Sequence, residues 1–114
     1  MSAAATPLHE VLRALADGNR RSILEVVRDR PRPVGEIAYQ VEMSQQAVSH
    51  HLSVLRGAGL VTSHREGTRH LFLVDAGGLG VVQEFLDGFW PAQLTALKRV
   101  AEAAASRPAG SDDD

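Results

Sequence analysis

Residues 44–56 combine apolar side chains at helical spacing with a row of short or planar hydrogen-bonding side chains. If this segment is a helix, Val48, Leu52 and Leu55 share one face and turn inward. The outward face then carries short or planar hydrogen-bonding groups rather than the Glu and Lys of an ordinary surface helix: Gln45, Gln46, Ser49, His50, Ser53 and Arg56. Gln can pair with the N6 and N7 atoms of adenine, and Ser can pair with donors or acceptors on base edges. The row predicts a helix that reads bases in a DNA major groove, and a merely polar exposed face is the alternative.

Two arginines follow in the segment HREGTRH, residues 64–70, where Arg65 and Arg69 lie on either side of Gly67. The flanking residues 60–65 and 69–74 are typical of strands, and residues 66–68 between them are typical of a short hairpin loop. Both guanidinium groups can then project beyond the fold and reach phosphates or an adjacent minor groove. An ordinary surface turn with incidental arginines is the alternative.

Histidines are concentrated in the same region, because four of the five (His50, His51, His64 and His70) lie between residues 43 and 70. Neighbouring helix residues point about 100° apart, so we expect His50 to face outward and His51 to pack behind the recognition face. His64 and His70 would be cross-strand neighbours if the hairpin loop has three residues. Two ligands are too few for a closed zinc site. We therefore expect DNA-facing or partly packed imidazoles, with no metal and no cofactor, and a surface position for His9.

No set of residues has the spacing of a catalytic site. The serines lie outside any G-x-S-x-G setting, which would present a nucleophilic serine on a tight turn. Residues 77–80, GGLG, lack the context of a phosphate-binding loop, and we interpret them as a flexible entry to the last helix. The sequence contains no cysteine, which removes disulfides, thiolate metal ligands and cysteine nucleophiles together. We predict that the protein is not an enzyme.

The elements that must position the outward row follow from the apolar spacing around it. A short helix carrying Val34, Ile37, Ala38 and Val41 on one face precedes the longer helix, which Ser44 is well placed to cap. A turn of three or four residues joins the two. Residues 34–60 therefore predict a helix-turn-helix.

Further helices are expected on both sides of this unit. The first has apolar residues at positions 8, 11, 12 and 15, with Pro7 as its first residue behind Thr6 as the N-cap. The second follows a break at residues 17–19 and ends before RPRP, residues 30–33. The last runs from residue 79 to residue 100, and Pro91 should kink or split it. The predicted fold is mainly α with a small β-hairpin, a winged helix-turn-helix of order α-α-α-α-β-β-α.

The length and the charge are compatible with one DNA-binding domain. The chain has 114 residues and a formal net charge of −2, and three of its fourteen acids form the run 112–114. Residues 43–70 carry three arginines against one acid, Glu66. We expect a mobile N-terminus over residues 1–6, a winged helix-turn-helix domain with dimerisation helices over residues 7–105, and a disordered acidic tail over residues 106–114.

Hydropathy bears on the cellular compartment. No apolar run approaches the roughly 20 residues that a membrane helix needs. No basic segment followed by an apolar one marks a secretory leader. We therefore expect a cytoplasmic protein without membrane contact.

Three blocks together resemble the ArsR family of winged-helix bacterial repressors, over about residues 8–100. They are LADGNRRSILEVV at residues 15–27, VGEIAYQVEMSQQAVSHHLSVLRGAGLV at residues 34–61, and REGTRH at residues 65–70. The later pattern of Phe89-Trp90, Leu94 and Leu97-Lys98 looks like a metal-free subgroup of that family. The resemblance implies a homodimer that binds an inverted-repeat operator and blocks transcription.

The departures from the family limit what the resemblance implies. Metal-sensing members place cysteines in the recognition region, or Asp, His and Glu sets on the last helix. This sequence has no cysteine and no histidine after His70. We therefore do not expect the family's metal or redox chemistry, and the sequence identifies no small-molecule effector.

Two sets of residues are predicted to carry the function. The DNA-contacting set consists of Ser44, Gln45, Gln46, Ser49, His50, Ser53, Arg56, Arg65 and Arg69. The first and last helices hold more apolar residues than a small core can absorb, and exposing them would be costly. The predicted dimer interface consists of Leu8, Val11, Leu12, Leu15, Phe85, Phe89, Trp90, Leu94 and Leu97. The alternative function is a winged-helix protein-interaction module without sequence-specific DNA binding, which the weak net charge and the acidic tail would suit.

Overall fold

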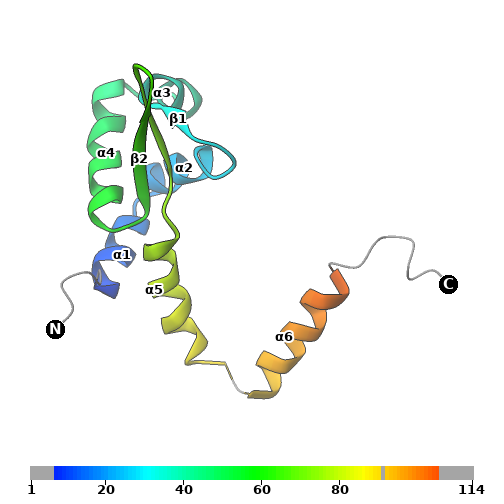
Figure 1. Ribbon diagram of the computed structural model, residues 1–114. Helices are drawn as coiled ribbons and strands as arrows, with labels where there is room; N and C mark the ends of the chain where they lie inside the picture. Colours follow the sequence, from blue (N-terminus) through cyan, green and yellow to red (C-terminus); the bar gives the residue numbers. More distant parts are fainter. Residues whose placement is uncertain (1–6, 91, 106–114) are drawn as a thin grey trace.

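The computed structural model describes residues 7–90 and 92–105, and over these residues the chain forms six helices and three short strands (Figure 1). The elements in chain order are α1 (Leu8–Leu15), α2 (Gly18–Val26), β1 (Arg32–Pro33), α3 (Val34–Val41), α4 (Gln45–Gly57), β2 (Val61–Glu66), β3 (Arg69–Val74), α5 (Ala76–Asp87) and α6 (Ala92–Ala105). The expected winged helix-turn-helix is present, with α3 and α4 as its helices and β2 and β3 as its wing. The segments expected to form a mobile N-terminus and an acidic tail lie outside the described residues, as does Pro91.

The hydrophobic core lies between helices α1 to α4 and the sheet. α2, α3 and α4 bury predicted apolar residues, among them Ile23, Ile37 and Leu55. In α1 only Val11 of the predicted stripe is completely buried, and Ala14, which the spacing did not predict, is buried beside it. Because α4 packs against both α2 and α3, one of its faces is buried and the other is left to solvent.

The sheet contains one strand more than the sequence predicted. Its order is β1-β3-β2, and all pairs are antiparallel. β1 has two residues, Arg32 opposite Phe72 and Pro33 opposite Leu71. A proline is tolerated there because β1 is an edge strand. The prolines of RPRP were expected only to end a helix, and α2 does end before them, at Val26.

The hairpin loop is shorter than predicted. β2 extends to Glu66, which pairs with Arg69, so only residues 67 and 68 form the loop. Gly67 takes a positive φ of 65° at the first loop position, which suits a tight two-residue hairpin turn. This register pairs His70 with Arg65 and His64 with Leu71. The three-residue loop that would have placed the two histidines opposite each other is therefore wrong.

Helix starts follow the predicted caps with one exception. Ser44 Oγ accepts a hydrogen bond from the amide of Ala47 at 3.0 Å and so caps α4. At α1 the N-cap is Pro7 itself, with extended backbone (φ −60°, ψ 143°), rather than the first helical residue. Thr6, the expected cap, lies outside the described residues.

Charged side chains join α1 to α2 at the turn between them. The carboxylate of Asp17 caps α2 by accepting hydrogen bonds from two amides of its first turn, at 2.8 and 3.3 Å. Arg20 Nε donates to the carbonyl of Ala14 at 2.8 Å, and Arg21 Nη1 donates to the carbonyl of Leu15 at 2.6 Å. The last carbonyls of a helix have no partner within that helix, so the two guanidinium groups fix the end of α1 to the start of α2.

Gly78 is packed at the start of α5, which corrects the interpretation of residues 77–80 as a flexible entry. Gly78 is buried, and its amide donates to the carbonyl of Gly59 at 2.8 Å. A Cβ atom at Gly78 would lie 2.7 Å from the carbonyl oxygen of Ala58 and 2.8 Å from that of Gly59. Only glycine allows α5 to begin this close to the carboxyl end of α4.

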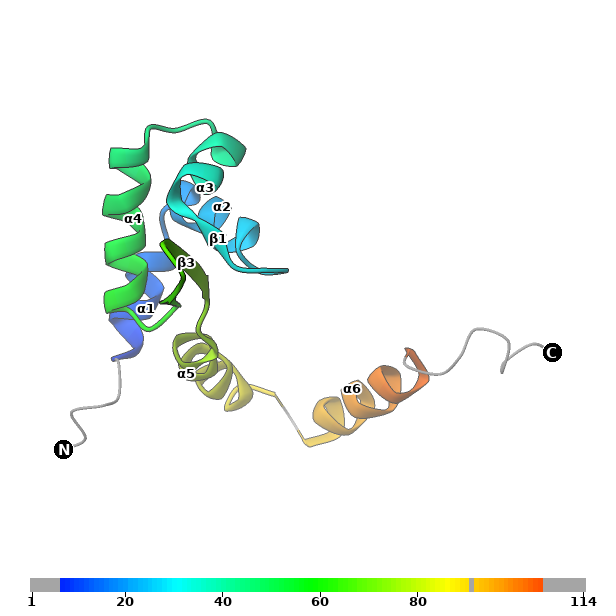
Figure 2. The ribbon, with the colours of Figure 1, turned by 45° about the horizontal axis from the view of Figure 1, so that its top comes forward.

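The predicted last helix is divided in two. α5 ends at Asp87 and α6 begins at Ala92. α5 packs against α1, whereas α6 lies apart from the body formed by α1 to α4 (Figures 1 and 2). The radius of gyration is 17.7 Å, compared with about 13 Å for a compact chain of roughly 100 residues. None of the helices in the described ranges is long and apolar enough to cross a membrane.

Candidate nucleic-acid interface

A three-residue turn, residues 42–44, joins α3 to α4. Glu42 takes the left-handed backbone conformation (φ 58°, ψ 48°), which residues other than glycine seldom adopt. The amide of Met43 donates to the carbonyl of Ala38 at 3.1 Å, so the chain turns sharply at the end of α3. As a result, the first turn of α4 and the tip of the β2–β3 hairpin lie at the same end of the molecule, the top of Figure 1.

The recognition helix α4 presents the two faces that its sequence predicted. Val48, Leu52 and Leu55 are buried beneath it. The predicted DNA-contacting residues of the cap and helix are all exposed: Ser44, Gln45, Gln46, Ser49, His50, Ser53 and Arg56. Apart from the cap made by Ser44, none of these side chains forms a hydrogen bond or ion pair with another residue in the described part of the chain. Their hydrogen-bonding groups face solvent.

Gln45 differs from the rest of the row because its side chain lies over α3. A Cβ atom at Gly35 would be 3.3 Å from Nε2 of Gln45. Gly35 therefore leaves room for the amide on the surface of α3. The outward surface of α3 adjoins the row on α4.

The hairpin exposes both predicted arginines, but on different faces. Arg65 pairs with His70 and Arg69 pairs with Glu66. Since neighbouring pairs in a ladder alternate between the two faces of a sheet, Arg65 and Arg69 point to opposite sides of the wing. His70 Nε2 lies 3.0 Å from Ser63 Oγ, so this imidazole is held within the sheet rather than presented at the tip.

The neighbouring histidines of α4 separate as expected. His50 is exposed and His51 is half-buried, with ring centroids 5.7 Å apart. Nδ1 of His51 is buried and has no hydrogen-bond partner within residues 7–90 and 92–105. Those same residues contain no group of three or more His, Cys, Asp or Glu side chains that could hold a metal ion.

Asp17, in the turn between α1 and α2, interacts electrostatically with Arg20 and with His51 of α4. Burial raises the pKa of Asp17, but hydrogen bonds from the amides of Asn19 and Arg20 lower it, as do the electrostatic interactions with Arg20 and His51. The lowering effects prevail, and the pKa of Asp17 lies below its ordinary value of 3.8. Asp17 is therefore ionised at neutral pH, behind the recognition helix.

The end of the molecule opposite the hairpin tip exposes large apolar side chains. Among the residues predicted to form a dimer interface, these are Leu12, Phe85, Phe89, Trp90, Leu94 and Leu97. Leu8 and Leu15 are half-buried, and Val11 is completely buried in the core. Including Val11 in the interface was wrong, because a 3.6-residue stripe does not reveal which members face the chain's own core.

Sequence reasoning also left out exposed apolar residues that belong to the same region. Leu79, Leu86 and Val100 are exposed on α5 and α6. All three lie on the helical period of residues 79–100, and that period was the signal that could have identified them.

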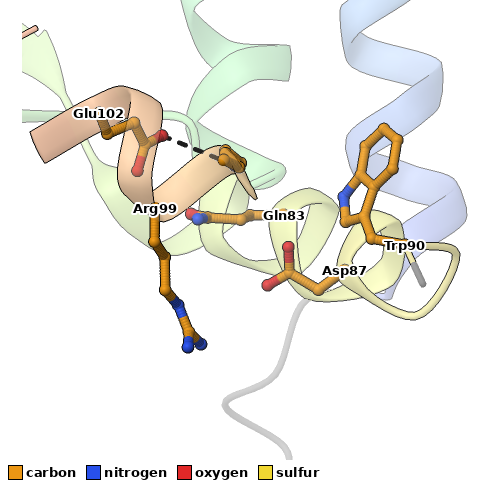
Figure 3. Close-up of a pocket in the computed structure, with 6 residues that line it drawn as sticks. Gln83, Asp87, Trp90, Arg99 and Glu102 are labelled. Carbon is orange, nitrogen blue, oxygen red and sulfur yellow. Dashed lines mark ion pairs between the residues drawn. The ribbon is translucent and has the colours of Figure 1, made fainter. Parts of the chain in front are cut away.

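A hollow of about 300 Å³ lies between α5 and α6 at this end, and Figure 3 shows its lining. Of the described residues, those that line it are Gln83, Asp87, Trp90, Lys98, Arg99 and Glu102. Its two acids and two bases balance, and Lys98 Nζ lies 3.9 Å from Glu102 Oε2. The lining therefore has no net charge that would select an ion, and it contains no nucleophile with an adjacent base.

Comparison with known proteins agrees with this geometry. Residues 17–63 match the family described as bacterial regulatory protein, arsR family. The chain is 41% identical over 90 residues to the HTH-type transcriptional regulator Rv2034 of Mycobacterium tuberculosis, and this match covers 79% of this chain and 84% of Rv2034. It is also 33% identical over 60 residues to the transcriptional repressor SdpR of Bacillus subtilis, and this match covers 53% of this chain and 67% of SdpR.

A solved structure of a related winged helix-turn-helix domain is also similar to this chain. The homodimeric winged helix-turn-helix DNA-binding domain of Mb0332 from Mycobacterium bovis, described as a possible ArsR-family transcriptional regulator, is 32% identical with a TM-score of 0.58. The match covers 73% of this chain and 81% of that domain.

The chain is a winged helix-turn-helix protein that binds DNA, because it combines a short helix and a sharp turn with an exposed recognition helix and an adjoining basic hairpin. The matches above identify the family within this class of proteins. It belongs to the ArsR family of bacterial transcriptional regulators. Its activity is the regulation of transcription and not the catalysis of a reaction.

Proposed function

We propose that this chain is a homodimeric repressor that binds an inverted-repeat operator through α4 and the β2–β3 hairpin. The observation that carries the proposal is the exposed row on α4, at the same end of the molecule as the basic hairpin tip. Such side chains can pair with base edges, and arginines beside them can neutralise phosphates. Residues 7–105 act as the functional domain, in the cytoplasm, where the chromosome of a bacterium lies.

Base reading and positioning are divided between the two elements. Gln45, Gln46, Ser49 and His50 contact base edges, and Ser53 and Arg56 extend the contact along α4. Ser44 caps a helix whose first amides and positive dipole point at a phosphate. Arg65 and Arg69, on opposite faces of the wing, contact the two backbones that border the adjacent minor groove.

The dimer is formed through the end opposite the DNA. Leu8, Leu12 and Leu15 of α1 meet an apolar surface on α5 and α6: Phe85, Phe89, Trp90, Leu94 and Leu97. Support comes from the exposure of six of these eight side chains and from the related Mb0332 domain, which is described as homodimeric. A two-fold axis would then place the two copies of α4 in successive major grooves, about 34 Å apart.

Repression follows from occupying a promoter. SdpR, a relative of this chain, is named a transcriptional repressor, and a protein bound across a promoter excludes the polymerase. The chain has no cysteine, so we propose that DNA binding needs no transition metal and does not respond to thiol oxidants. Regulation would come from abundance, from a partner, or from a ligand between the dimer helices.

A binding experiment tests the proposal. Fragments of the source genome that the purified chain retains would be sequenced to derive the operator, and gel-shift titrations at moderate salt would compare it with a shuffled duplex. We expect retardation of the operator at concentrations at least about 1,000-fold lower than those needed for the shuffled duplex, which is the lower limit typical of specific DNA binders. Equal retardation of both, or none, would favour the protein-interaction module.

A further inference from the structure

Tyr39 of α3 is an aromatic side chain that the fold leaves in solvent. It is 83% exposed, although Ile37 and Ala38 beside it are buried. It is also the only tyrosine in the chain. A phenol combines an apolar ring with a hydroxyl that can donate and accept a hydrogen bond. Tyr39 therefore has contact area and a polar group that the fold does not use.

The position of Tyr39 connects it to the recognition row. Gly35 and Tyr39 are four residues apart on α3 and share one face of that helix. Gln45 Nε2 lies 3.3 Å from the place of a Cβ atom at Gly35. Tyr39 is thus about one helical turn from the first side chain of the row. The surface that α4 presents continues onto α3 and includes Tyr39.

The other exposed side of α3 faces elsewhere. Gln40 and Glu42 line a hollow of about 480 Å³ that α3 forms with α2, together with Ser22 and Asn19. Exposure alone therefore does not assign a residue of α3 to the recognition surface. Gln40 provides a matched control for Tyr39.

The charge of α3 does not oppose an approach to phosphates. Its acid Glu36 is paired with Arg30, whose Nη2 lies 2.7 Å from Glu36 Oε2, and with Arg32. Two guanidinium groups on one carboxylate leave this cluster without negative charge. A DNA backbone that runs along the edge of the groove can therefore lie beside Tyr39.

We propose that Tyr39 is a further DNA-contacting residue, whose hydroxyl donates a hydrogen bond to a backbone phosphate while its ring packs on the adjoining deoxyribose. The inference rests on the proposed function. In helix-turn-helix proteins the helix before the recognition helix crosses the backbone. Phosphate contacts fix the register of a protein on the duplex without reading the sequence. Tyr39 is therefore a positioning contact, and Gln46 and its neighbours read the bases.

The first test compares Tyr39→Phe, Tyr39→Ala and Gln40→Ala on the selected operator and on an unrelated duplex. One hydrogen bond changes affinity by a factor of about 2 to 10, and a dimer makes two such contacts, so the two factors multiply to about 4 to 100. We expect Tyr39→Phe to weaken binding about 4-fold to 100-fold on both duplexes, Tyr39→Ala to weaken it more, and Gln40→Ala to leave it unchanged.

The salt dependence separates this role from that of an arginine. A neutral phenol releases no counterion, so the slope of log affinity against log salt should be the same for wild type and Tyr39→Phe. Wild-type affinity in both Tyr39 variants, or a loss equal to that of Gln40→Ala, would overturn the inference alone. A wild-type chain that retains no DNA would overturn the proposed function as well.

A second test needs no variant. With one tyrosine and no cysteine, nitration by tetranitromethane has a single tyrosine target, and mass spectrometry of the peptide that contains it reports the extent. We expect the free chain to be nitrated readily, the operator complex to be protected, and protection to be lost when salt dissociates the complex. Equal nitration of free and operator-bound chain would overturn the inference.

Discussion

Gln46 and Ser49 project from the first turns of α4 with hydrogen-bonding groups that no other described residue satisfies, whereas Ser44 and Ser63 use theirs inside the fold. This difference distinguishes a side chain that is available to DNA from one that stabilises the protein. It also separates the two arginines at the wing tip, which are exposed, from Arg20 and Arg21, which hold α1 to α2.

Replacing Gln46 by Ala should therefore affect recognition and leave the fold intact. A bidentate contact between Gln and adenine contributes about 1–3 kcal/mol of discrimination, and we expect that loss on the operator with a smaller one on unrelated DNA. Gel-shift titrations of Gln46→Ala and of the control Gln40→Ala on both duplexes provide the measurement. A loss of affinity of equal size on both duplexes would contradict base reading by Gln46.

Replacing Arg65 or Arg69 by Ala should weaken binding to operator and unrelated DNA alike. Each arginine neutralises a phosphate, so its loss should flatten the salt dependence by about one counterion per contact in each subunit. Affinities measured over a series of salt concentrations give this slope. Because the two arginines point to opposite faces of the wing, each single variant should show the effect; an unchanged slope in one of them would remove that residue from the interface.

The lowered pKa of Asp17 makes a prediction about acid stability. Its pKa in the folded chain lies below the ordinary value of 3.8, so the ionised carboxylate stabilises the fold above that value, and the contribution is lost as the pH falls through the folded pKa. Asp17→Asn keeps a good capping residue and removes the charge. Urea denaturation should find the variant less stable than wild type at neutral pH, with the difference vanishing in strong acid. A difference that is constant with pH would show that the charge has no part in it.

At the scale of elements, the helices were predictable because their stripes extend over two or more turns. The row on α4 was predictable for the same reason, together with the cap at Ser44. β1 was not, since two residues have no periodicity and Arg32 and Pro33 become a strand only by pairing with β3. The length of the hairpin loop depended on whether Glu66 joins the ladder opposite Arg69, which the local sequence leaves open.

The glycines of α5 allow a matched test of the contact between α5 and α4. A Cβ atom at Gly78 would meet backbone carbonyls at 2.7 and 2.8 Å, which no side-chain rotation can relieve, whereas a Cβ atom at Gly80 meets nothing within 4 Å. We expect Gly78→Ala to lower the free energy of unfolding by about 1–3 kcal/mol. Gly80→Ala should raise it by about 0.5–1 kcal/mol, as alanine does in a helix interior. Urea denaturation of both variants measures this contrast, and two equal changes would contradict it.

The whole molecule is two regions with opposite chemistry. The end with the hairpin tip is polar and locally basic, and the end formed by α1, α5 and α6 exposes aromatic and aliphatic side chains. Phe89 is 66% exposed and Leu97 is 62% exposed. Apolar patches of this kind mark association surfaces, and an extended α6 has little to pack against within one chain.

Phe89→Glu should therefore dissociate the dimer without unfolding the chain. A charge placed in an apolar interface loses its hydration and finds no partner, whereas the same residue in the exposed monomer is solvated. Sedimentation equilibrium at micromolar concentration should find a dimer for wild type and for the control Ser22→Glu on α2, and a monomer for Phe89→Glu. Operator affinity should fall with the dimer. A wild-type chain that sediments as a monomer would contradict the interface.

The close approach of Gly78 to the carboxyl end of α4 has a mechanical consequence. In a dimer joined through α5, we expect the start of α5 and the carboxyl end of α4 to move together, because a hydrogen bond joins Gly78 to Gly59 and no room is left between Gly78 and the carbonyl of Ala58. A change in the angle at which two copies of α5 cross would then be transmitted to both copies of α4. Spin labels on the two copies of α4 would report the change as a distance. A change in the dimer interface would thus alter the distance between the two copies of α4. No rearrangement of the hydrophobic core would be needed to couple the interface to DNA binding.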